Sequence, residues 1–155
     1  MIASTHLAVG AAVGLTVQKC LSESSSPEKL FWAFVVGVAS HVVLDALPHK
    51  EYTVDGLRLW LVLLVETGVV FALVLSLQNS LLLNLLIFFG MAGGAIPDLI
   101  ELSYRYFVKW PLLVNLGSKI HIFHGTIPTG LEVNFYFQLL IAFAAIILVK
   151  FKPAF

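Results

Sequence analysis

Apolar residues gather in five long stretches along the chain, and most polar residues fall between them. The stretches cover residues 2–17, 30–47, 57–77, 81–96 and 131–149. A helix that crosses the hydrocarbon core of a bilayer needs about 20 mostly apolar residues, and roughly 17 at the least. The pattern therefore predicts an all-α fold, a multi-pass membrane helical bundle of about five spans with an interfacial segment before the last span.

Prolines, glycines and small polar residues predict where these helices begin, end and touch. Pro27 lies near the expected start of the second helix, with Ser26 as its N-cap. The fourth helix is expected to break at its Gly-Gly pair and Pro97, because proline has no amide hydrogen to donate. Glycines spaced like Gly10 and Gly14 let a second helix approach closely. The glycines expected at such packing contacts are Gly10, Gly14, Gly90, Gly93 and Gly94.

The composition agrees with a membrane protein. Of 155 residues, 59% are apolar and 12% are charged, and the mean hydropathy is +0.97. A soluble domain carries about 25% charged residues, so we expect one membrane-embedded domain over residues 1–155. Nine basic and nine acidic residues cancel, so the net charge gives no electrostatic argument for nucleic-acid binding, which needs a basic surface. The one cysteine, Cys20, excludes an internal disulfide, and no basic residue precedes the first stretch, which argues against a cleaved signal peptide.

Five crossings would place successive connections on alternate faces of the membrane. The N-terminus, the 48–56 loop and the 98–130 segment would share one face, and the 22–29 hinge, the 78–80 turn and the C-terminus the other. The positive-inside rule favours the first face as cytoplasmic, but only narrowly. That face would carry Lys50, Arg58, Arg105, Lys109 and Lys119, and the other Lys19, Lys29, Lys150 and Lys152.

The candidate chemistry lies at that first face. All five histidines are expected there, and so are the carboxylates that end the second and fourth spans. Glu66 lies about nine residues into the third span, roughly 14 Å below the face at about 1.5 Å per residue. An ionisable residue at the centre of a membrane helix costs about 2.5–3.5 kcal/mol, so such residues are normally paired, inward-facing and functional. The candidate metal ligands are His6, His41, Asp45, His49, Asp98, His121 and His124.

The spacing of these residues favours shared coordination. His41, Asp45 and His49 are each four residues apart, and positions i and i+4 lie on one face of a helix, so His41 and Asp45 can bind one ion. Pro48 leaves open whether His49 turns toward this pair. Imidazole and carboxylate ligands without a thiolate suit Zn(II), Mn(II) or Fe(II). Because the candidates exceed the four ligands that one zinc ion takes, we expect two or three divalent ions, zinc first among them.

Each of these residues also has a structural interpretation. A lone interfacial histidine such as His6 or His49 is more often hydrated or hydrogen-bonded than a metal ligand. The His41–Asp45 pair has the alternative of a hydrogen bond between helices. Glu66 is open between three roles: a metal ligand, a partner of a histidine, and a protonated carboxyl bonded to a backbone carbonyl.

Four blocks of the sequence resemble the bacterial inner-membrane metal-dependent hydrolase family. They are Thr5-His6-Leu7-Ala8-Val9-Gly10, the block from Ser40-His41 through Asp45 to Pro48-His49, Pro97-Asp98, and His121 to His124-Gly125-Thr126. That family is distantly similar to zinc-dependent phospholipase C and the single-strand-specific zinc nucleases, which are helical and bind three zinc ions. The resemblance implies an inner-membrane location, with Asp45 as a carboxylate that bridges metals, His41 beside it, and His6 as a further ligand.

These observations lead to a membrane-embedded, metal-dependent hydrolase of phosphoesters such as phospholipid headgroups, with metal-activated water as the nucleophile. Asp45, Glu101 and Glu66 are the candidate catalytic carboxylates. Arg105 and Lys109, in an aromatic and basic run typical of a membrane interface, are the candidates for binding the phosphate. The expected partners are membrane lipid and a phosphoester substrate, and the oligomeric state is open.

Two other functions stay open at this point, a metal or proton carrier and a non-catalytic membrane protein with a structural metal. A carrier needs polar residues that continue toward the second face. Only Gln18, Asn84 and Gln138 are expected in or near that half of the spans, while Glu66 is the best support for a carrier.

Overall fold

The computed structural model describes residues 2–49, 56–75, 80–106, 111–112, 115, 119 and 135–150. The elements of this part of the chain are helices joined by short turns, without a strand, which confirms the all-α prediction. The helices are α1 (Ala3–Cys20), α2 (Ser26–Ala46), α3 (Gly56–Leu75), α4 (Leu81–Tyr106) and α6 (Phe135–Lys150).

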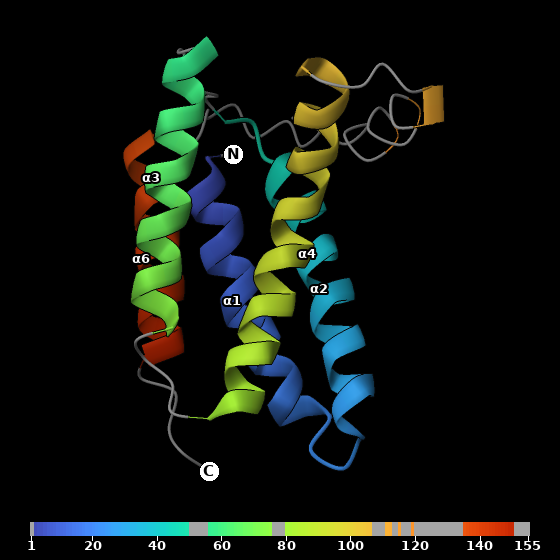
Figure 1. The fold of residues 1–155 in the computed structure, drawn as a ribbon. Coiled ribbons are helices and arrows are strands. Elements are labelled where there is room, and N and C mark those ends of the chain that lie inside the picture. The colour runs from blue at the N-terminus through green and yellow to red at the C-terminus, as the bar shows by residue number, and fades with distance from the viewer. Residues whose placement is uncertain are drawn as a thin grey trace.

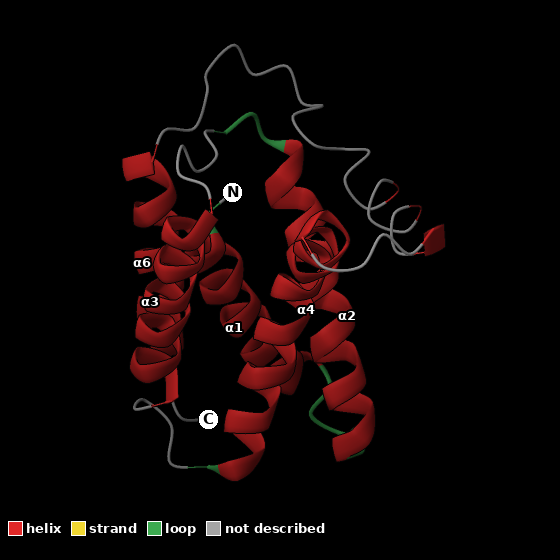
Figure 2. Cartoon of the chain, turned by 45° about the horizontal axis from the view of Figure 1, so that its top comes forward, coloured by secondary structure: helices red, strands yellow, loops and turns green. Residues whose placement is uncertain are grey.

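Successive helices run in opposite directions (Figure 1). α1 begins at one end of the bundle, which we call the N-terminal end, and α2 and α4 finish there while α3 and α6 start there. α1 lies between the pair α3 and α6 and the pair α2 and α4, and it contacts all four of these helices (Figures 1 and 2). Chain segments far apart in the sequence therefore meet around the first turns of α1.

Two of the described helices are long and apolar enough to cross a membrane, α2 and the Leu81–Ser103 part of α4. α6 is apolar but shorter, with 16 residues. The structure thus supports membrane association, and the five-span arrangement stays a prediction.

α2 begins one residue earlier than the sequence suggests. Ser25 is the N-cap, with extended backbone angles of φ −65° and ψ 155°, and its carbonyl accepts the amide of Lys29 at 3.0 Å. The prediction of Ser26 as N-cap is wrong, because Ser26 already has its place in the helix. Pro27 lies in the first turn as expected, where a missing amide hydrogen costs nothing.

The predicted break in the fourth helix is also wrong. α4 continues through Pro97, which lies inside the helix. Proline leaves the carbonyl of Gly93 without its helical donor, but α4 packs along its length against α1 and α2. We attribute the continuous helix to these packing contacts, which outweigh the lost hydrogen bond.

The close contacts of α4 are made at glycines, which we call the glycine seam. A Cβ atom added to Gly10 or to Gly37 would collide with the carbonyl oxygen of Gly90, and one added to Gly93 would collide with the carbonyl oxygen of Phe34. The predicted close packing at glycine is therefore confirmed. The seam consists of Gly10, Gly14, Gly37, Gly90, Gly93 and Gly94.

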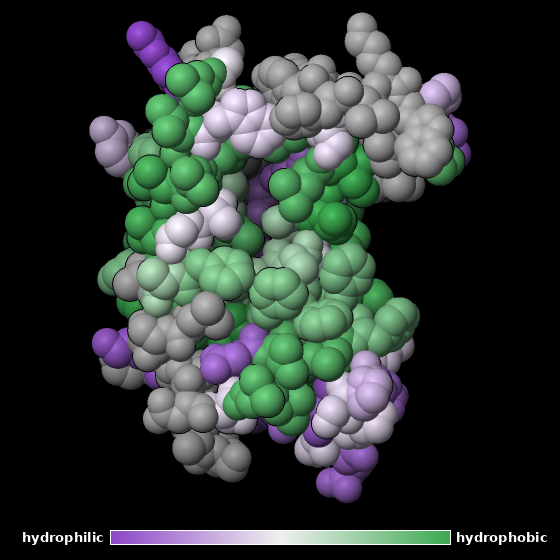
Figure 3. Space-filling model, in the orientation of Figure 1, coloured by the Kyte–Doolittle hydropathy of each residue, from purple (hydrophilic) through white to green (hydrophobic). Residues whose placement is uncertain are grey.

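The outside of the bundle is largely apolar. On α3, Leu57, Leu64 and Val65 are exposed, and on α6 Phe143 and Leu148 are exposed. In the orientation of Figure 3, apolar residues cover most of the described face, and hydrophilic residues gather toward the two ends. Apolar patches of this extent are rare on soluble monomers and mark a surface that contacts a membrane or a partner.

Candidate metal centre

Three helices bring four ionisable side chains together at the N-terminal end of the bundle. His6 comes from the first turns of α1, His41 and Asp45 from the last turns of α2, and Asp98 follows Pro97 in α4. One ligand atom from each of the four lies within 4.8 Å of the others. The structure therefore brings these four residues together at one end of the bundle, and we call them the His/Asp cluster. Their place at a membrane face stays a prediction.

Asp45 lies at the centre of the cluster. Its Oδ1 is 3.2 Å from Nε2 of His6, and its Oδ2 is 3.0 Å from Nε2 of His41. Nε2 of His41 is also 3.7 Å from Oδ1 of Asp98. The two imidazole rings stack with centroids 4.1 Å apart. Oδ1 of Asp45 thus faces His6 of α1, and Oδ2 faces His41 of α2.

The backbone of α4 orients the ring of His41. Its Nδ1 lies 2.8 Å from the carbonyl oxygen of Gly94, and because a carbonyl only accepts hydrogen bonds, Nδ1 is the donor. Histidines that bind metals are commonly oriented in this way by a backbone carbonyl, which leaves Nε2 for the metal. The spacing of His41 and Asp45 does not reveal this contact, because it depends on how closely α2 and α4 approach at the glycine seam.

The cluster is buried on all sides but one. The exposed fraction of the side chain is 0% for His6, 1% for His41 and 6% for Asp45, whereas it is 32% for Asp98. Neither ring nitrogen of His6 makes a hydrogen bond of good geometry with a described residue, although Nε2 lies close to Asp45. A buried polar atom without a hydrogen bond is costly, and a cation bound between this nitrogen and Asp45 would satisfy it.

The distances in the cluster fit a divalent ion. Four tetrahedral ligands about 2.0–2.2 Å from zinc lie roughly 3.3–3.6 Å from one another. The separations of 3.0, 3.2 and 3.7 Å in the cluster are close to this range. Two neutral imidazoles and two carboxylates also carry the charge that neutralises one divalent cation. The four side chains therefore form a group that could hold a metal ion.

His49 lies beside the cluster, just beyond the end of α2. Its Nε2 is 3.9 Å from Oδ1 of Asp45, and its Nδ1 donates to the carbonyl oxygen of Leu47 at 2.7 Å. The turn at Pro48 thus directs His49 toward Asp45. The sequence had left open whether His49 turns toward the His41–Asp45 pair. His49 is an additional candidate ligand on the Oδ1 side of Asp45.

The other predicted carboxylates are not members of the cluster. Glu66 accepts a hydrogen bond from the backbone amide of Ser4 at 3.1 Å, two residues before His6. Glu101 lies three residues beyond Asp98 in α4 and is partly buried. Lys109, His121 and His124 lie outside the described residues, as does the side chain of Arg105, so their roles stay predictions.

The position predicted for Gln138 is wrong. The sequence places it in or near the half of the spans remote from the histidines, whereas the structure places it at the N-terminal end. Its Oε1 accepts the amide of Ile2 at 2.8 Å, and its backbone carbonyl accepts the hydroxyl of Thr5 at 3.0 Å. The first amides of a helix need partners outside that helix, and this rule could have pointed to a polar side chain such as Gln138 near the start of α1.

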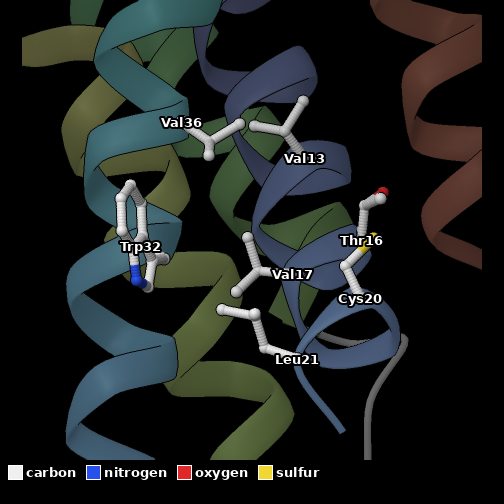
Figure 4. Close-up of a pocket in the computed structure, with 7 residues that line it drawn as sticks. All are labelled: Val13, Thr16, Val17, Cys20, Leu21, Trp32 and Val36. Atoms are coloured by element: carbon white, nitrogen blue, oxygen red, sulfur yellow. The ribbon is translucent and has the colours of Figure 1, made fainter. Parts of the chain in front are cut away.

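The groove between α1 and α2 at the opposite end is of a different kind. It has a volume of about 290 Å³, and apolar side chains such as Val13, Val17 and Val36 line it together with Cys20 (Figure 4). The hydroxyl of Thr16 in this groove donates to the carbonyl of Ala12 in the same helix. The groove therefore lacks the acids and histidines that hydrolysis needs, and the His/Asp cluster is the better candidate site.

Comparisons with protein-family models, curated proteins and solved structures give no match to this chain.

Proposed function

We propose that this protein is a membrane-embedded, metal-dependent hydrolase of phosphoesters such as phospholipid headgroups. The His/Asp cluster carries the proposal, because His6, His41, Asp45 and Asp98 meet in a buried group with ligand distances suited to a divalent ion. Buried charges are retained in proteins when they are paired or bind metals.

The surface supports a bundle of about five membrane spans. α1 has 18 residues and α3 has 20, which corresponds to roughly 27–30 Å of helix and matches a hydrocarbon core of about 30 Å. Exposed apolar side chains on α3 and α6 would face lipid. The alternating helix directions in Figure 1 agree with successive crossings. With such crossings the cluster would lie near one membrane face.

The donor set favours zinc, with manganese and iron as alternatives. Imidazole and carboxylate ligands suit all three ions, and tetrahedral groups of four suit zinc best. The two oxygens of Asp45 face His41 on one side and His6 with His49 on the other. We therefore propose one ion held by His6, His41, Asp45 and Asp98 in common. A second ion would lie on the Oδ1 side of Asp45, next to His49.

A divalent ion in such a site lowers the pKa of water and stabilises the charge of a phosphoester during displacement. Asp98, the most exposed member of the cluster, lies where a substrate would enter. Arg105 and Lys109 follow it in the sequence and are proposed to bind the substrate phosphate. A site at one end of an apolar bundle suits a substrate whose headgroup is in water and whose tails are in lipid.

The same residues agree with the resemblance to the bacterial inner-membrane metal-dependent hydrolase family. We therefore propose that the protein lies in the inner membrane, with the cluster at the cytoplasmic face.

The glycine seam favours a hydrolase over a carrier. Below the cluster, the backbones of α1 and α2 are in contact with that of α4 at Gly10, Gly37 and Gly90, which leaves no room for an ion at these contacts.

The proposal is tested by turnover of a phosphodiester by purified full-length protein loaded with zinc. Asp45→Asn keeps the shape of the side chain and removes its charge, so we expect turnover to fall by at least about 1000-fold, or about 4 kcal/mol of barrier. The matched control is Glu23→Gln, which removes one exposed carboxylate at the opposite end of the bundle and should leave turnover unchanged.

Zinc-loaded protein without turnover on water-soluble phosphodiesters and on phospholipids would reject the hydrolase proposal. A non-catalytic protein with a structural metal would then be the better description.

A further inference from the structure

Helices that contribute no member of the His/Asp cluster hold the first turn of α1. Gln138 of α6 is fully buried, and it accepts the backbone amide of Ile2 through Oε1 and the hydroxyl of Thr5 through its backbone carbonyl. Glu66 of α3 accepts the amide of Ser4. Two of the first backbone amides of α1 and one side-chain hydroxyl are therefore bonded to neighbouring helices.

These bonds act where a helix is least stable. The first amides of a helix have no partner within it, and helix ends fray when nothing outside the helix binds them. Thr5 is fully buried. Of these three bonds, the one from Thr5 is donated by a side chain, and the other two are donated by backbone amides. The first turn is consequently held in one position against α6.

His6 follows Thr5 directly. Its ring is 1% exposed, and its Nε2 must reach Oδ1 of Asp45 on a different helix. A shift of the first turn by a fraction of an ångström would move this nitrogen relative to His41 and Asp45, because the helix backbone is stiff. Residues that orient the ligands of a metal typically change its affinity by about 10–100-fold when they are mutated.

We infer that Gln138 is a positioning residue of the metal centre, which holds the first turn of α1 so that Nε2 of His6 meets Asp45. The inference rests on the proposed function in one respect, that the cluster binds a metal. It extends the site to α6, a helix without any ligand in the cluster, and it gives a reason for a fully buried glutamine in a largely apolar helix.

The test uses Co(II) as a probe metal on the full-length protein in detergent, because visible absorption of Co(II) reports both affinity and ligand geometry. Gln138→Met keeps the length of the side chain and removes the oxygen that accepts the amide of Ile2. We expect the dissociation constant for Co(II) to rise by about 10–100-fold, with a changed absorption spectrum of the bound ion. Gln18→Met, at the opposite end of α1, is the matched control and should leave both unchanged.

A purely structural role of Gln138 would lower the thermal midpoint of the metal-free protein and leave the spectrum of bound Co(II) as in wild type. A second pair of variants serves if Gln138→Met does not fold. Thr5→Val removes the hydroxyl and should weaken Co(II) binding with an altered spectrum, and Thr5→Ser keeps the hydroxyl and should restore both.

Wild-type affinity and spectrum in Gln138→Met and in Thr5→Val would overturn the inference about Gln138 and leave the proposed function standing. A wild-type protein that binds neither Co(II) nor zinc would instead overturn the metal centre itself, and the role of Gln138 with it.

Discussion

Asp45 is the residue on which the cluster depends most. Its side chain is 6% exposed, and its two oxygens lie 3.2 Å and 3.0 Å from the Nε2 atoms of His6 and His41. Asp98 approaches the same group with 32% of its side chain exposed to the surroundings. Asp45 therefore connects two histidines, whereas Asp98 lies close to one. Water can also take the place of the Asp98 carboxylate more easily, because that side chain is more exposed.

This difference predicts unequal effects on metal binding. Asp45→Asn should weaken zinc affinity by more than about 100-fold, beyond the range of residues that only orient ligands. Asp98→Asn should weaken it less, because water can occupy the exposed position. Competition with a chromophoric zinc chelator measures both constants, and an equal or larger loss for Asp98→Asn would contradict the central place of Asp45.

At the scale of the helices, the seam explains both the packing and one wrong prediction. The backbone of Gly90 in α4 is in direct contact with the backbones of Gly10 in α1 and Gly37 in α2. The sequence shows the proline and the glycines but not the contacts that keep α4 helical through Pro97. A break was predicted because the local cost of proline is visible in the sequence, whereas the compensating contacts with other helices are not.

Substitutions in the seam should be costly, whereas a substitution at Gly68, outside the seam, should be tolerated. Gly90→Ala places a Cβ against the carbonyl oxygen of Gly10, and we expect a loss of about 1–3 kcal/mol in stability from overpacking. Gly68→Ala in α3 is the matched control, because a Cβ there meets nothing within 4 Å, and alanine should stabilise that helix by up to about 1 kcal/mol. Thermal unfolding in detergent compares the two variants, and equal midpoints would show that the seam contributes little.

The site itself was predictable where spacing along one helix determines distance, and not where helices meet. The i, i+4 spacing predicts the contact of His41 with Asp45, and the alternation of spans places His6 and Asp98 at the same end. The contacts of Glu66 with Ser4 and of Gln138 with Ile2 join residues 62 and 136 positions apart. No pattern within one helix encodes such a pairing, since it follows from the rotation of each helix in the bundle.

At the scale of the whole molecule, metal binding and folding should be linked. The cluster joins α1, α2 and α4, so an ion that binds only the folded protein stabilises all three helices together. Zinc at about 100 times its dissociation constant should add about 2.7 kcal/mol to the stability, and a chelator should remove this gain. The midpoint of thermal unfolding, measured with zinc and with chelator, tests the linkage. In Asp45→Asn the same zinc concentration should add at most about 0.4 kcal/mol, because the affinity is weakened by more than about 100-fold.

The central claim is that His6, His41, Asp45 and Asp98 bind a metal ion in common. Its most direct test is an anomalous-scattering map of zinc-loaded crystals, recorded on both sides of the zinc absorption edge. We predict a peak within about 2.0–2.2 Å of ligand atoms from these side chains. Zinc peaks found only elsewhere in such crystals, with the four side chains unchanged and no density between them, would contradict the account.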